Sequence, residues 1–529
     1  KHWLDNNEED YRMTMSVEVS ERAQHEIYMP VFEAAIEAGA GAVMCSYQKV
    51  AGVHACANEH LLKKLLRQDL GFKGFVMSDW GATHDAELSA LNGLDMEMPG
   101  GTDSHFSKLA SLVKQGVVPE STIDEMATHV LSAMYATGLF DGQFKWSTGE
   151  AALDSNVTSD RHREVAKQTI VDGAVLLKNV GSTLPLGKTP GKIAMIGKYC
   201  NKAHDRSYGQ GDVFSGGGSG WVMSEMQVTP LRGVKEHFPS SEVVWGPTAT
   251  TAVGASVAVV CASAHAEEGW DRANLTLPEA QELVDALKAQ SPGQKVIVLA
   301  ISPGAVTTEW VEKADAALLL FMPGEQVGVA VAELLSGVSS PGGRLPISLP
   351  SRSEHRFTKE QYPGAPFNNK NMVTQWSEGV LVGYRWNDAM DTRAAYPFGF
   401  GLTYTAFVYD NFAAQCTPGA EAAVVSFRVA NMGPVAGAAV PQLYVSFPSL
   451  RPALRQLRGF QKAFLKPSES GLVQFALSPM DWRFWSEASQ SWESAAAKGE
   501  PITVYVGTSS AEFAWSQVLP CVFSPPPAA

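Results

Sequence analysis

Short apolar runs alternate with amphipathic segments through the first 140 residues of the chain. The apolar runs predict strands at 1–3, 39–47, 74–79 and 94–98. The amphipathic segments predict helices at 58–70, 84–93, 106–116 and 121–140. Strands that alternate with helices form parallel βα units. The chain therefore begins with about four such units, which is half of what a (β/α)8 barrel needs to close.

The alternation resumes between residues 173 and 337 and stops near residue 400. Apolar runs such as 255–263 and 295–301, separated by the helical segment 278–290, predict a second parallel sheet that helices cover on both faces. Beyond residue 400, short strands are separated by Gly, Pro and Asn turns. This pattern predicts a small antiparallel sandwich.

Composition excludes several kinds of partner. The 529 residues carry a net charge of −14 and contain no block of basic residues, so we expect neither a nucleic acid nor a membrane surface as partner. No apolar run reaches the roughly 20 residues of a membrane-spanning helix. Neither a CxxC pair nor an HExxH motif occurs, so we expect no metal and no cofactor.

The strand at 74–79 ends on Ser78-Asp79-Trp80, which makes Asp79 the best single candidate for a catalytic residue. A carboxylate at the carboxyl end of a barrel strand is either catalytic or the N-cap of the next helix, and Ser78 and Thr83 compete for that cap. Trp80 offers an aromatic face on which a sugar ring stacks, although a tryptophan is more often a core residue.

A second candidate stretch, 261–278, places Glu267 and Glu268 in a loop after an apolar strand. A solvated turn explains the same composition, and composition alone favours it. The Gly-rich segment 213–221 lacks the spacing of a phosphate loop or a dinucleotide site, so it is a loop that approaches a ligand closely or a plain surface loop. Two carboxylates in separate domains are what glycoside hydrolysis needs, one as nucleophile or base and the other as proton donor.

Several motifs resemble those of glycoside hydrolase family 3, the β-glucosidase family. "GFKGFVMSDWGA" (71–82) is similar to its nucleophile segment, and the stretch from residue 21 to residue 75 matches almost without gaps. "GAVLLKNVGSTLPL", "PGGRLPISLP", "EGVLVGYRW" and "YPFGFGLTYTAFVY" resemble its second-domain and domain-joining motifs. "VPQLYVSF" and "LRGFQKAFLKPSES" resemble its C-terminal fibronectin type III-like domain. The resemblance covers essentially the whole chain.

The resemblance implies a multidomain α/β fold with the catalytic pocket between the first two domains. The C-terminal part of a (β/α)8 barrel, at 1–141, precedes a linker at 142–165. An α/β sandwich follows at 166–398, and a fibronectin type III-like β-sandwich at 399–529. The family's barrel begins much earlier, with an Asp and an Arg that grip the sugar. We therefore expect the chain to be a piece of a longer product.

The resemblance also implies a two-step reaction that retains the anomeric configuration. Asp79 is carried over as the nucleophile and Glu268 as the general acid/base. We expect Lys1 to help keep Asp79 ionised, and Glu268 to hold its proton to higher pH than Asp79 does. The residues carried over as substrate-binding are Lys1, His2, Met44, Tyr47, Trp80 and Ser219.

Four positions depart from the usual pattern of the family. Glu267 stands where Gly or Ser often precedes the acid/base, and its charge either raises the proton affinity of Glu268 or makes Glu267 the acid. Trp3, Asn7 and Gln48 replace the common Phe/Tyr, Glu and Asn. These three changes bear on specificity more than on reaction type.

The expected activity is hydrolysis of terminal non-reducing β-D-glucosyl residues, with a β-glucoside or oligosaccharide as substrate. The alternatives are a β-xylosidase or broader exo-glycosidase of the family, and a non-catalytic sugar-binding relative. An N-acetylglucosaminidase fits less well because "KHWLDNN" lacks a His-containing loop. A phosphorylase would favour a His at the acid/base position, where this chain has Glu268.

The signals for localisation point weakly to export. The polar start "KHWLDNNEEDYR" is no signal peptide, while N-glycosylation sequons begin at Asn156 and Asn274. Six cysteines are too few for a disulfide scaffold. Cys45 and Cys56, however, resemble a pair that is bridged in secreted fungal relatives. We expect a secreted or extracellular protein.

Overall fold

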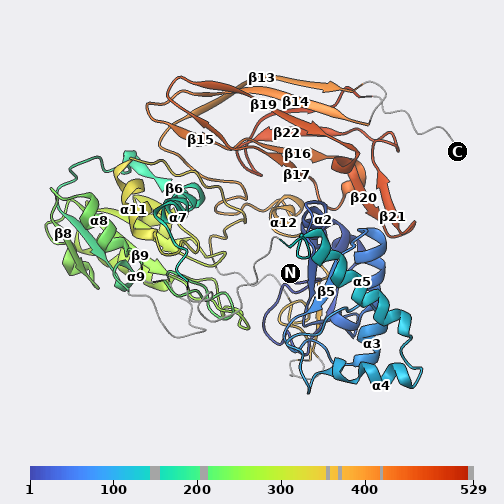
Figure 1. Ribbon diagram of the computed structural model, residues 1–529. Helices are drawn as coiled ribbons and strands as arrows, with labels where there is room; N and C mark the ends of the chain where they lie inside the picture. Colours follow the sequence, from blue (N-terminus) through green and yellow to red (C-terminus); the bar gives the residue numbers. More distant parts are fainter. Residues whose placement is uncertain are drawn as a thin grey trace. The chain divides into compact units, whose positions relative to one another are not determined.

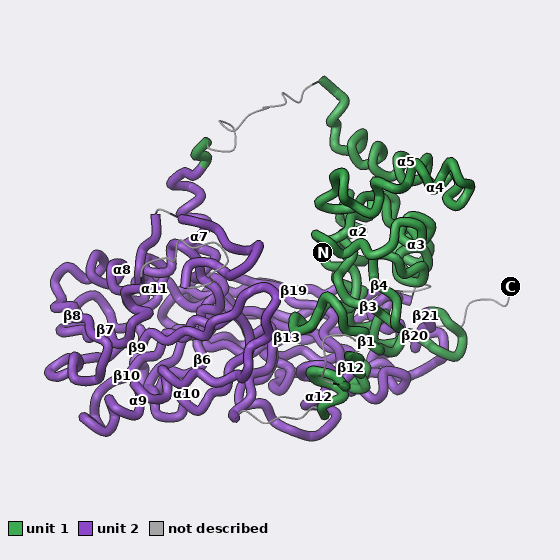
Figure 2. Tube along the Cα trace, turned by 90° about the horizontal axis from the view of Figure 1, so that it is seen from below, with its two compact units in different colours: residues 1–157, 355–380, 485–491 green, residues 158–354, 381–484, 492–529 purple. Residues whose placement is uncertain are grey.

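The computed structural model describes residues 1–142, 155–202, 213–224, 226–352, 358–366, 372–417 and 421–521. The chain divides into two compact units, coloured separately in Figure 2. Unit 1 holds residues 1–157, 355–380 and 485–491, and unit 2 holds residues 158–354, 381–484 and 492–529. Each unit has hydrophobic cores of its own.

The centre of unit 1 is a short parallel sheet that includes β5, which is labelled in Figure 1, with one further segment bridged to each edge. β2 (Ala42–Cys45) pairs in parallel with β5 (Phe75–Ser78). Parallel bridges add Trp3 beside β2 and Met96 beside β5. Two of the four strands expected from the apolar runs are therefore confirmed, at 42–45 and 75–78, while the expected strands at 1–3 and 94–98 contribute one parallel bridge each. The four segments lie in chain order, as the strands of a barrel do.

The helices of unit 1 follow these strands and cover them. The segment η3 (His60–Asp69) buries four leucines on one face, while the side chains of Lys63 and Lys64 are 40% and 50% exposed. This is the amphipathic pattern that predicted the helix. The other helical segments are α1 (Glu21–Ala23), η1 (Gln24–Tyr28), α2 (Pro30–Glu37), η2 (Ala55–Ala57), α3 (Ala86–Leu91), η4 (His105–Lys108), α4 (Leu109–Lys114) and α5 (Glu120–Ala136).

A small second sheet of unit 1 joins segments that are far apart in the sequence. β1 (Ser16–Glu18) pairs in parallel with β12 (Val373–Gln375) on one side and with the hairpin β3 (Lys49–Val50) and β4 (Val53–His54) on the other. The indole of Trp485 stacks on the buried ring of His25, with 3.4 Å between the ring centroids. No sequence pattern had pointed to either contact.

Unit 2 contains a six-stranded sheet in the order β6-β11-β10-β9-β7-β8. Its strands are β6 (Val175–Asn179), β7 (Ile193–Ile196), β8 (Val243–Gly246), β9 (Val257–Ser263), β10 (Lys295–Ile301) and β11 (Ala316–Leu319). Successive residues of the central strands enter two separate cores, because side chains alternate between the faces of a strand. The expectation of an all-parallel sheet is wrong at one edge, since β6 runs antiparallel to β11.

Helices cover both faces of this sheet, as the continuous apolar runs predicted. One core includes α7 (Asp160–Gly173), α8 (Pro230–His237) and α11 (Val327–Ser336). The other includes α9 (Pro278–Gln290) and α10 (Glu309–Lys313).

The chain changes direction across the sheet at β7. β8 pairs with one edge of β7, and β9, which follows β8 in the sequence, pairs with the other. In open α/β sheets such a switch point leaves a crevice beyond the carboxyl ends of the strands, where ligands bind. A small pocket at this end of the sheet is lined by Tyr199, Lys202, Met322 and residues 263–266.

The last part of unit 2 is the predicted antiparallel β-sandwich. Its larger sheets have the strand orders β13-β14-β19 and β17-β16-β22-β23. The strands are β13 (Phe407–Cys416), β14 (Ala423–Asn431), β15 (Gly437–Ala439), β16 (Gln442–Ser446), β17 (Gln456–Phe460), β18 (Ala463–Leu465), β19 (Ser470–Leu477), β22 (Thr503–Gly507) and β23 (Phe513–Val518). A further hairpin pairs β20 (Arg483–Ser486) with β21 (Ser491–Ser494), and α12 (Tyr384–Ala389) precedes the sandwich.

All six cysteines are paired, as Cys45–Cys56, Cys200–Cys261 and Cys416–Cys521. The expected Cys45–Cys56 bridge is confirmed, with 5.2 Å between the two Cα atoms. The other two pairs were not anticipated. Three disulfides indicate an oxidising compartment outside the cytosol.

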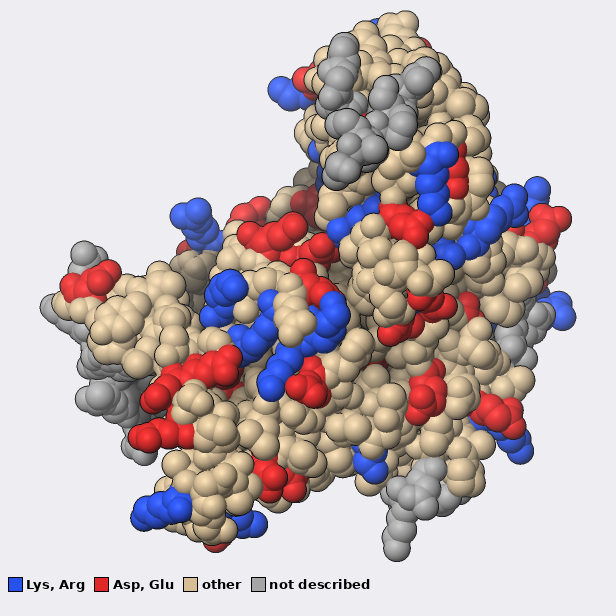
Figure 3. Space-filling model, turned by 90° about the vertical axis from the view of Figure 1, so that its right-hand side faces the viewer, with Lys and Arg blue, Asp and Glu red and all other residues tan. Residues whose placement is uncertain are grey.

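Two further observations concern the exterior of the protein. Within the described ranges, no helix has the length and apolar character needed to span a membrane. On the face that Figure 3 shows, acidic and basic side chains are interspersed.

We predict that the chain, unfolded without reductant and treated with an alkylating reagent, takes up no label at any cysteine. After reduction the same treatment should label all six. Reduction of the folded protein should also lower its stability by about 2–4 kcal/mol for each bridge that opens, because the unfolded chain regains entropy. Mass spectrometry counts the labels, and a labelled Cys45 in the unreduced sample would contradict the pairing.

Candidate active site

Asp79 lies directly after β5, at the carboxyl end of the parallel row in unit 1. Its backbone N–H donates to the carbonyl oxygen of Cys45 at 3.3 Å, and Ser78 N–H donates to Met96 at 2.9 Å. The start of β5 can approach its neighbour because residue 74 is glycine, where a Cβ would stand 2.2 Å from the oxygen of Gly41. The register of the strands thus fixes the position of the Asp79 carboxylate at the carboxyl end of β5.

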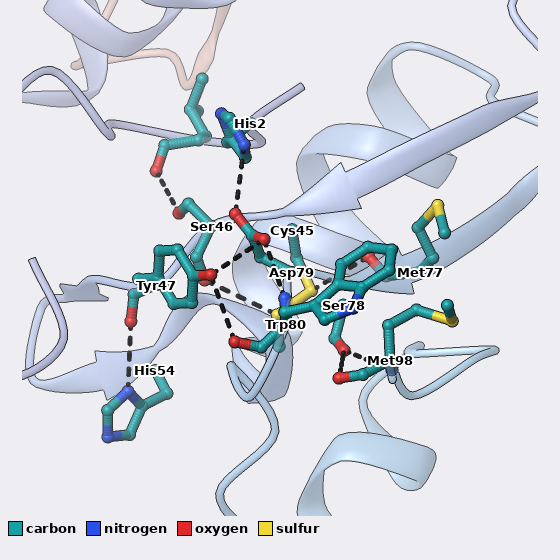
Figure 4. The surroundings of a disulfide bond; sticks show 12 residues. His2, Cys45, Ser46, Tyr47, His54, Met77, Ser78, Asp79, Trp80 and Met98 are labelled. Atoms are coloured by element: carbon teal, nitrogen blue, oxygen red, sulfur yellow. Dashed lines mark hydrogen bonds and ion pairs between the residues drawn. A yellow bond between two sulfur atoms is a disulfide. The ribbon is translucent and has the colours of Figure 1, made fainter. Parts of the chain in front are cut away.

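The Asp79 carboxylate is buried and has three polar neighbours, which Figure 4 shows. Tyr47 Oη donates to Oδ1 at 3.0 Å, and the N–H of Trp80 donates to the same oxygen at 2.8 Å. His2 Nε2 lies 3.1 Å from Oδ2, which is an ion-pair distance, although the ring is not aligned for a strong hydrogen bond.

These neighbours decide the charge of Asp79. Burial raises the pKa of the carboxyl group, but the contacts with His2, the Trp80 N–H and Tyr47 outweigh burial, so the pKa lies below its ordinary value. Asp79 is therefore ionised at neutral pH, which is the state a nucleophile needs.

The alternative interpretation of Asp79 as a helix cap is wrong. The N-cap of α3 is Asp85, whose side chain accepts from the N–H of Leu88 at 2.7 Å. Ser78 Oγ accepts from the N–H of Met98 at 2.8 Å and so holds the neighbouring strand segment. The Asp79 side chain is left to face His2 and Tyr47.

Tyr47 is held in place by the covalent and polar structure of its loop. The disulfide Cys45–Cys56 closes the loop that carries Tyr47, and the Arg12 guanidinium lies 4.6 Å from the centroid of the Tyr47 ring. Tyr47 Oη also lies 3.2 Å from the carbonyl oxygen of Trp80. Sequence reasoning found Tyr47 but missed Arg12, for which "EEDYR" offered no distinctive signal.

The other residues expected to bind substrate in unit 1 have different surroundings. Lys1 is exposed, and within the described ranges the ion pair to Asp79 comes from His2 rather than from Lys1. The ring of Trp80 is 50% exposed beside Asp79, and Met44 is half-buried on β2. Trp80 is therefore accessible to a ligand, which a core tryptophan is not.

A pair of histidines that the sequence analysis did not single out lies near this cluster. The rings of His54 and His84 stack with 3.7 Å between centroids, and His54 Nδ1 lies 3.4 Å from the carbonyl oxygen of Tyr47. Burial and the nearby His84 lower the pKa of His54 to about 4, so His54 is neutral at ordinary pH.

Glu268 lies in unit 2, in the loop that follows β9 at the switch point. Glu267 and Trp270 form an antiparallel bridge, so Glu268 and Gly269 occupy the tip of a tight turn. Gly269 has φ +86°, a conformation that favours glycine.

The two adjacent glutamates of this turn have different partners. The carboxylate of Glu268 is bonded to Ser219 of the Gly-rich loop, through the backbone N–H at 2.7 Å and through the hydroxyl group. Glu267 instead faces His265 Nε2 at 3.4 Å. The structure thus brings together two segments, 213–221 and 261–278, that the sequence analysis had considered separately.

Asp79 belongs to unit 1 and Glu268 belongs to unit 2, so each carboxyl group is described within its own unit. Within the described part of the chain, no three His, Cys, Asp or Glu side chains form a group that could hold a metal ion.

The chain matches family models along most of its length. The glycosyl hydrolase family 3 N terminal domain matches residues 5–133, the family 3 C-terminal domain matches residues 174–404, and the fibronectin type III-like domain matches residues 439–510. Together with the relatives described next, these matches show that the chain belongs to glycoside hydrolase family 3, as its motifs predicted.

Curated relatives and solved structures agree with this assignment. Probable beta-glucosidase L of Aspergillus fumigatus is 34% identical over 96% of this chain and 75% of its own length. An exo-alpha-(1->6)-L-arabinopyranosidase of Bifidobacterium longum is 32% identical over 97% of this chain and 68% of its own length.

The crystal structure of beta-glucosidase D2-BGL from Chaetomella raphigera has a TM-score of 0.88 at 31% identity, and covers 98% of this chain and 78% of its own. Beta-glucosidase 3B of Thermotoga neapolitana, solved in complex with alpha-D-glucose, has a TM-score of 0.84 at 27% identity. The match covers 98% of this chain and 76% of the Thermotoga chain. Similarity therefore identifies the chain as a family 3 exo-glycosidase. Most of the relatives named here are β-glucosidases.

We predict that Tyr47→Phe raises the pKa of Asp79 and destabilises the protein by about 1–2 kcal/mol at pH 7, because an ionised carboxylate loses a donor. A group whose folded pKa is depressed stabilises the fold above its unfolded pKa, and this stabilisation is lost as pH falls through the folded value. The difference between wild type and variant should therefore shrink as the pH falls below the ordinary carboxyl pKa of 3.8 toward the lower folded value.

Chemical denaturation at several pH values measures this difference. Tyr404→Phe is the control, because Tyr404 Oη donates to the carbonyl oxygen of Leu334 at 2.8 Å, which does not titrate. The loss of stability caused by Tyr404→Phe should be the same at the highest and at the lowest pH measured. A Tyr47→Phe cost that is equally independent of pH would mean that Tyr47 does not stabilise the charge on Asp79.

Proposed function

We propose that the protein is a retaining, exo-acting β-glucosidase that releases terminal non-reducing β-D-glucosyl residues. The observation that carries this proposal is the buried carboxylate of Asp79, kept ionised by His2, Trp80 and Tyr47 at the carboxyl end of a barrel-like strand. Such a group is suited to attack an anomeric carbon. The β-glucosidase names of the relatives support glucose as the sugar.

In the proposed first step, Asp79 Oδ2 attacks the anomeric carbon while the bond to the leaving oxygen breaks. Glu268 transfers its proton to that oxygen, so the aglycone leaves as a neutral alcohol. In the second step, Glu268 takes a proton from water as the water oxygen attacks the same carbon. The ester bond to Asp79 breaks, and the sugar leaves with its configuration retained.

We propose Glu268 rather than Glu267 as the acid/base. Glu268 occupies the tip of the turn and is held by the Gly-rich loop, whereas Glu267 lies on the flank and faces His265. A carboxyl group at a turn tip can reach a substrate that a flanking residue cannot.

The remaining assignments rest on position in the same cluster. His2 and Trp80 would bind and stack the sugar beside Asp79, and Met44 would line the wall on β2. Lys1, exposed at the same strand, would contact sugar hydroxyls. Ser219 would meet the substrate from unit 2.

Two other functions remain as alternatives. A β-xylosidase or a broader exo-glycosidase would use the same two carboxylates, and the arabinopyranosidase among the relatives shows that other pyranosides occur in this family. A non-catalytic sugar-binding protein would not need an ionised carboxylate buried beside two hydrogen-bond donors and a histidine, which favours an enzyme.

We also propose that the protein is secreted. The three disulfides support an oxidising environment. Both sequon asparagines, Asn156 and Asn274, are exposed, as glycosylation requires.

We predict that a 2-deoxy-2-fluoro glucoside with a good leaving group labels Asp79, because the fluorine slows both steps but hydrolysis of the intermediate more. Peptide mapping by mass spectrometry locates the label. Asp79→Asn should abolish labelling and reduce turnover of a nitrophenyl β-glucoside by several orders of magnitude. Faster turnover of the matching β-xyloside would favour the alternative sugar, and a label on a carboxylate other than Asp79 would overturn the assignment of the nucleophile.

We predict that Glu268→Ala loses activity on substrates with poor leaving groups, while glycosylation by activated aryl glucosides is spared. Added azide should restore turnover of the activated substrate, because a small anion can replace water without a base. Glu267→Ala is the matched control and should show neither effect. If Glu267→Ala alone shows this signature, the roles of the two glutamates are reversed.

A further inference from the structure

The Gly-rich loop of unit 2 has a fixed base and a projecting tip. At its base, Val213 and Phe214 are 1% and 7% exposed and belong to one of the two cores beside the sheet. Ser215 Oγ accepts from the N–H of Val222 at 2.8 Å and donates to the carbonyl oxygen of Gly216 at 3.1 Å. The loop is thus closed on itself, and its tip at 218–219 is presented to Glu268.

The tip meets the Glu268 carboxylate with two donors. The backbone N–H and the hydroxyl of Ser219 both bond to Oε2, the former at 2.7 Å. Both donors come from one residue at a fixed position, so they restrain where Oε2 lies. Hydrogen bonds to a carboxylate favour its ionised form.

Gly218 leaves the space in which Glu268 sits. A Cβ at residue 218 would stand 2.3 Å from the Cβ of Glu268 and 2.8 Å from its Oε2. Gly218 also has φ +69°, which side chains disfavour. Gly216 in the same loop has neither restriction, because nothing lies within 4 Å of its Cβ position. Residue 218 therefore requires glycine both for its backbone conformation and for its contact with Glu268, whereas residue 216 requires it for neither.

We propose that Gly218 and Ser219 form a cradle that positions the acid/base carboxylate of Glu268, and that Ser219 is a positioning residue in addition to any contact with the sugar. This inference rests on the proposed function. Held in the cradle, the carboxyl group of Glu268 gives its proton to the leaving oxygen in the first step and receives one from water in the second.

The cradle also limits how Ser219 can meet a sugar. A serine hydroxyl has one proton to donate, and here that proton is directed to Oε2. Toward a sugar hydroxyl, Ser219 Oγ is therefore an acceptor only. A bound sugar that donates to Oγ would strengthen the bond from Oγ to Glu268, since hydrogen bonds in a chain polarise one another.

The test is the pH profile of kcat/KM for a substrate with a poor leaving group. The alkaline limb reports the loss of the acid's proton. Ser219→Ala removes a donor that favours the ionised form, so this limb should move upward by about half to one pH unit. The rate at the optimum should fall about tenfold. Ser219→Thr keeps a hydroxyl and should restore the limb.

A matched pair of alanine variants tests the space beside Glu268. Gly218→Ala should lose the acid-dependent step, with a rate on poor leaving groups at least about tenfold below that of Gly216→Ala. Gly216→Ala should behave as wild type. Ser215→Ala disturbs the closure of the loop without removing a donor to Glu268, so it should leave the alkaline limb in place. A Ser219→Ala profile with an unmoved limb, or equal effects at 216 and 218, would refute the cradle.

Labelling separates this inference from the proposed function. The fluoro-sugar has an activated leaving group and does not need the acid, so Ser219→Ala should still be labelled at Asp79. Labelled wild type together with an unchanged Ser219→Ala profile would refute the cradle alone. Absence of label from the wild type would remove the proposed function, and the role of the cradle with it.

Discussion

The ionised state of a buried carboxylate is the constraint on which the arrangement of unit 1 depends. Burial opposes the charge on Asp79, and three groups from three parts of the chain offset that cost. His2 comes from the first strand segment, and Tyr47 comes from the loop closed by Cys45–Cys56. The parallel register brings both to the end of β5. The strand register and the Cys45–Cys56 bridge thus place these groups around one side chain.

Unit 2 presents the carboxylate that we propose as the acid/base, which has to give up and regain a proton. Glu268 is half-buried at the tip of a turn, beyond the switch point of the sheet. It is bonded to Ser219 of the neighbouring Gly-rich loop. The two proposed catalytic carboxylates are therefore built on two different scaffolds, one at a strand end and one on a turn against a loop.

Much of the fold, and the position of Asp79 at a strand end, could be predicted because they depend on local sequence patterns. The four strand segments of unit 1, the covered sheet of unit 2 and the sandwich follow from apolar periodicity and turn residues. Asp79 was found because a strand ends on it, but its partner was assigned to Lys1 and proved to be His2, since spacing does not tell which of two adjacent side chains points inward. The pairing of β12 with β1, the antiparallel β6 and the contact of Ser219 with Glu268 depend on tertiary packing that no local pattern encodes.

The bridge between Cys200 and Cys261 joins the short helical segment η6 (Lys198–Cys200), which follows β7, to β9, the strand that pairs with β7. β8 lies between them in the chain and on the far side of β7 in the sheet. With the bridge closed, the segment after β7 stays beside β9, so β8 is left to the other edge of β7. The chain between the two cysteines includes the Gly-rich loop at 213–221. This one covalent bond therefore shortens the range that the loop and Glu268, which follows Cys261 by seven residues, can explore relative to each other.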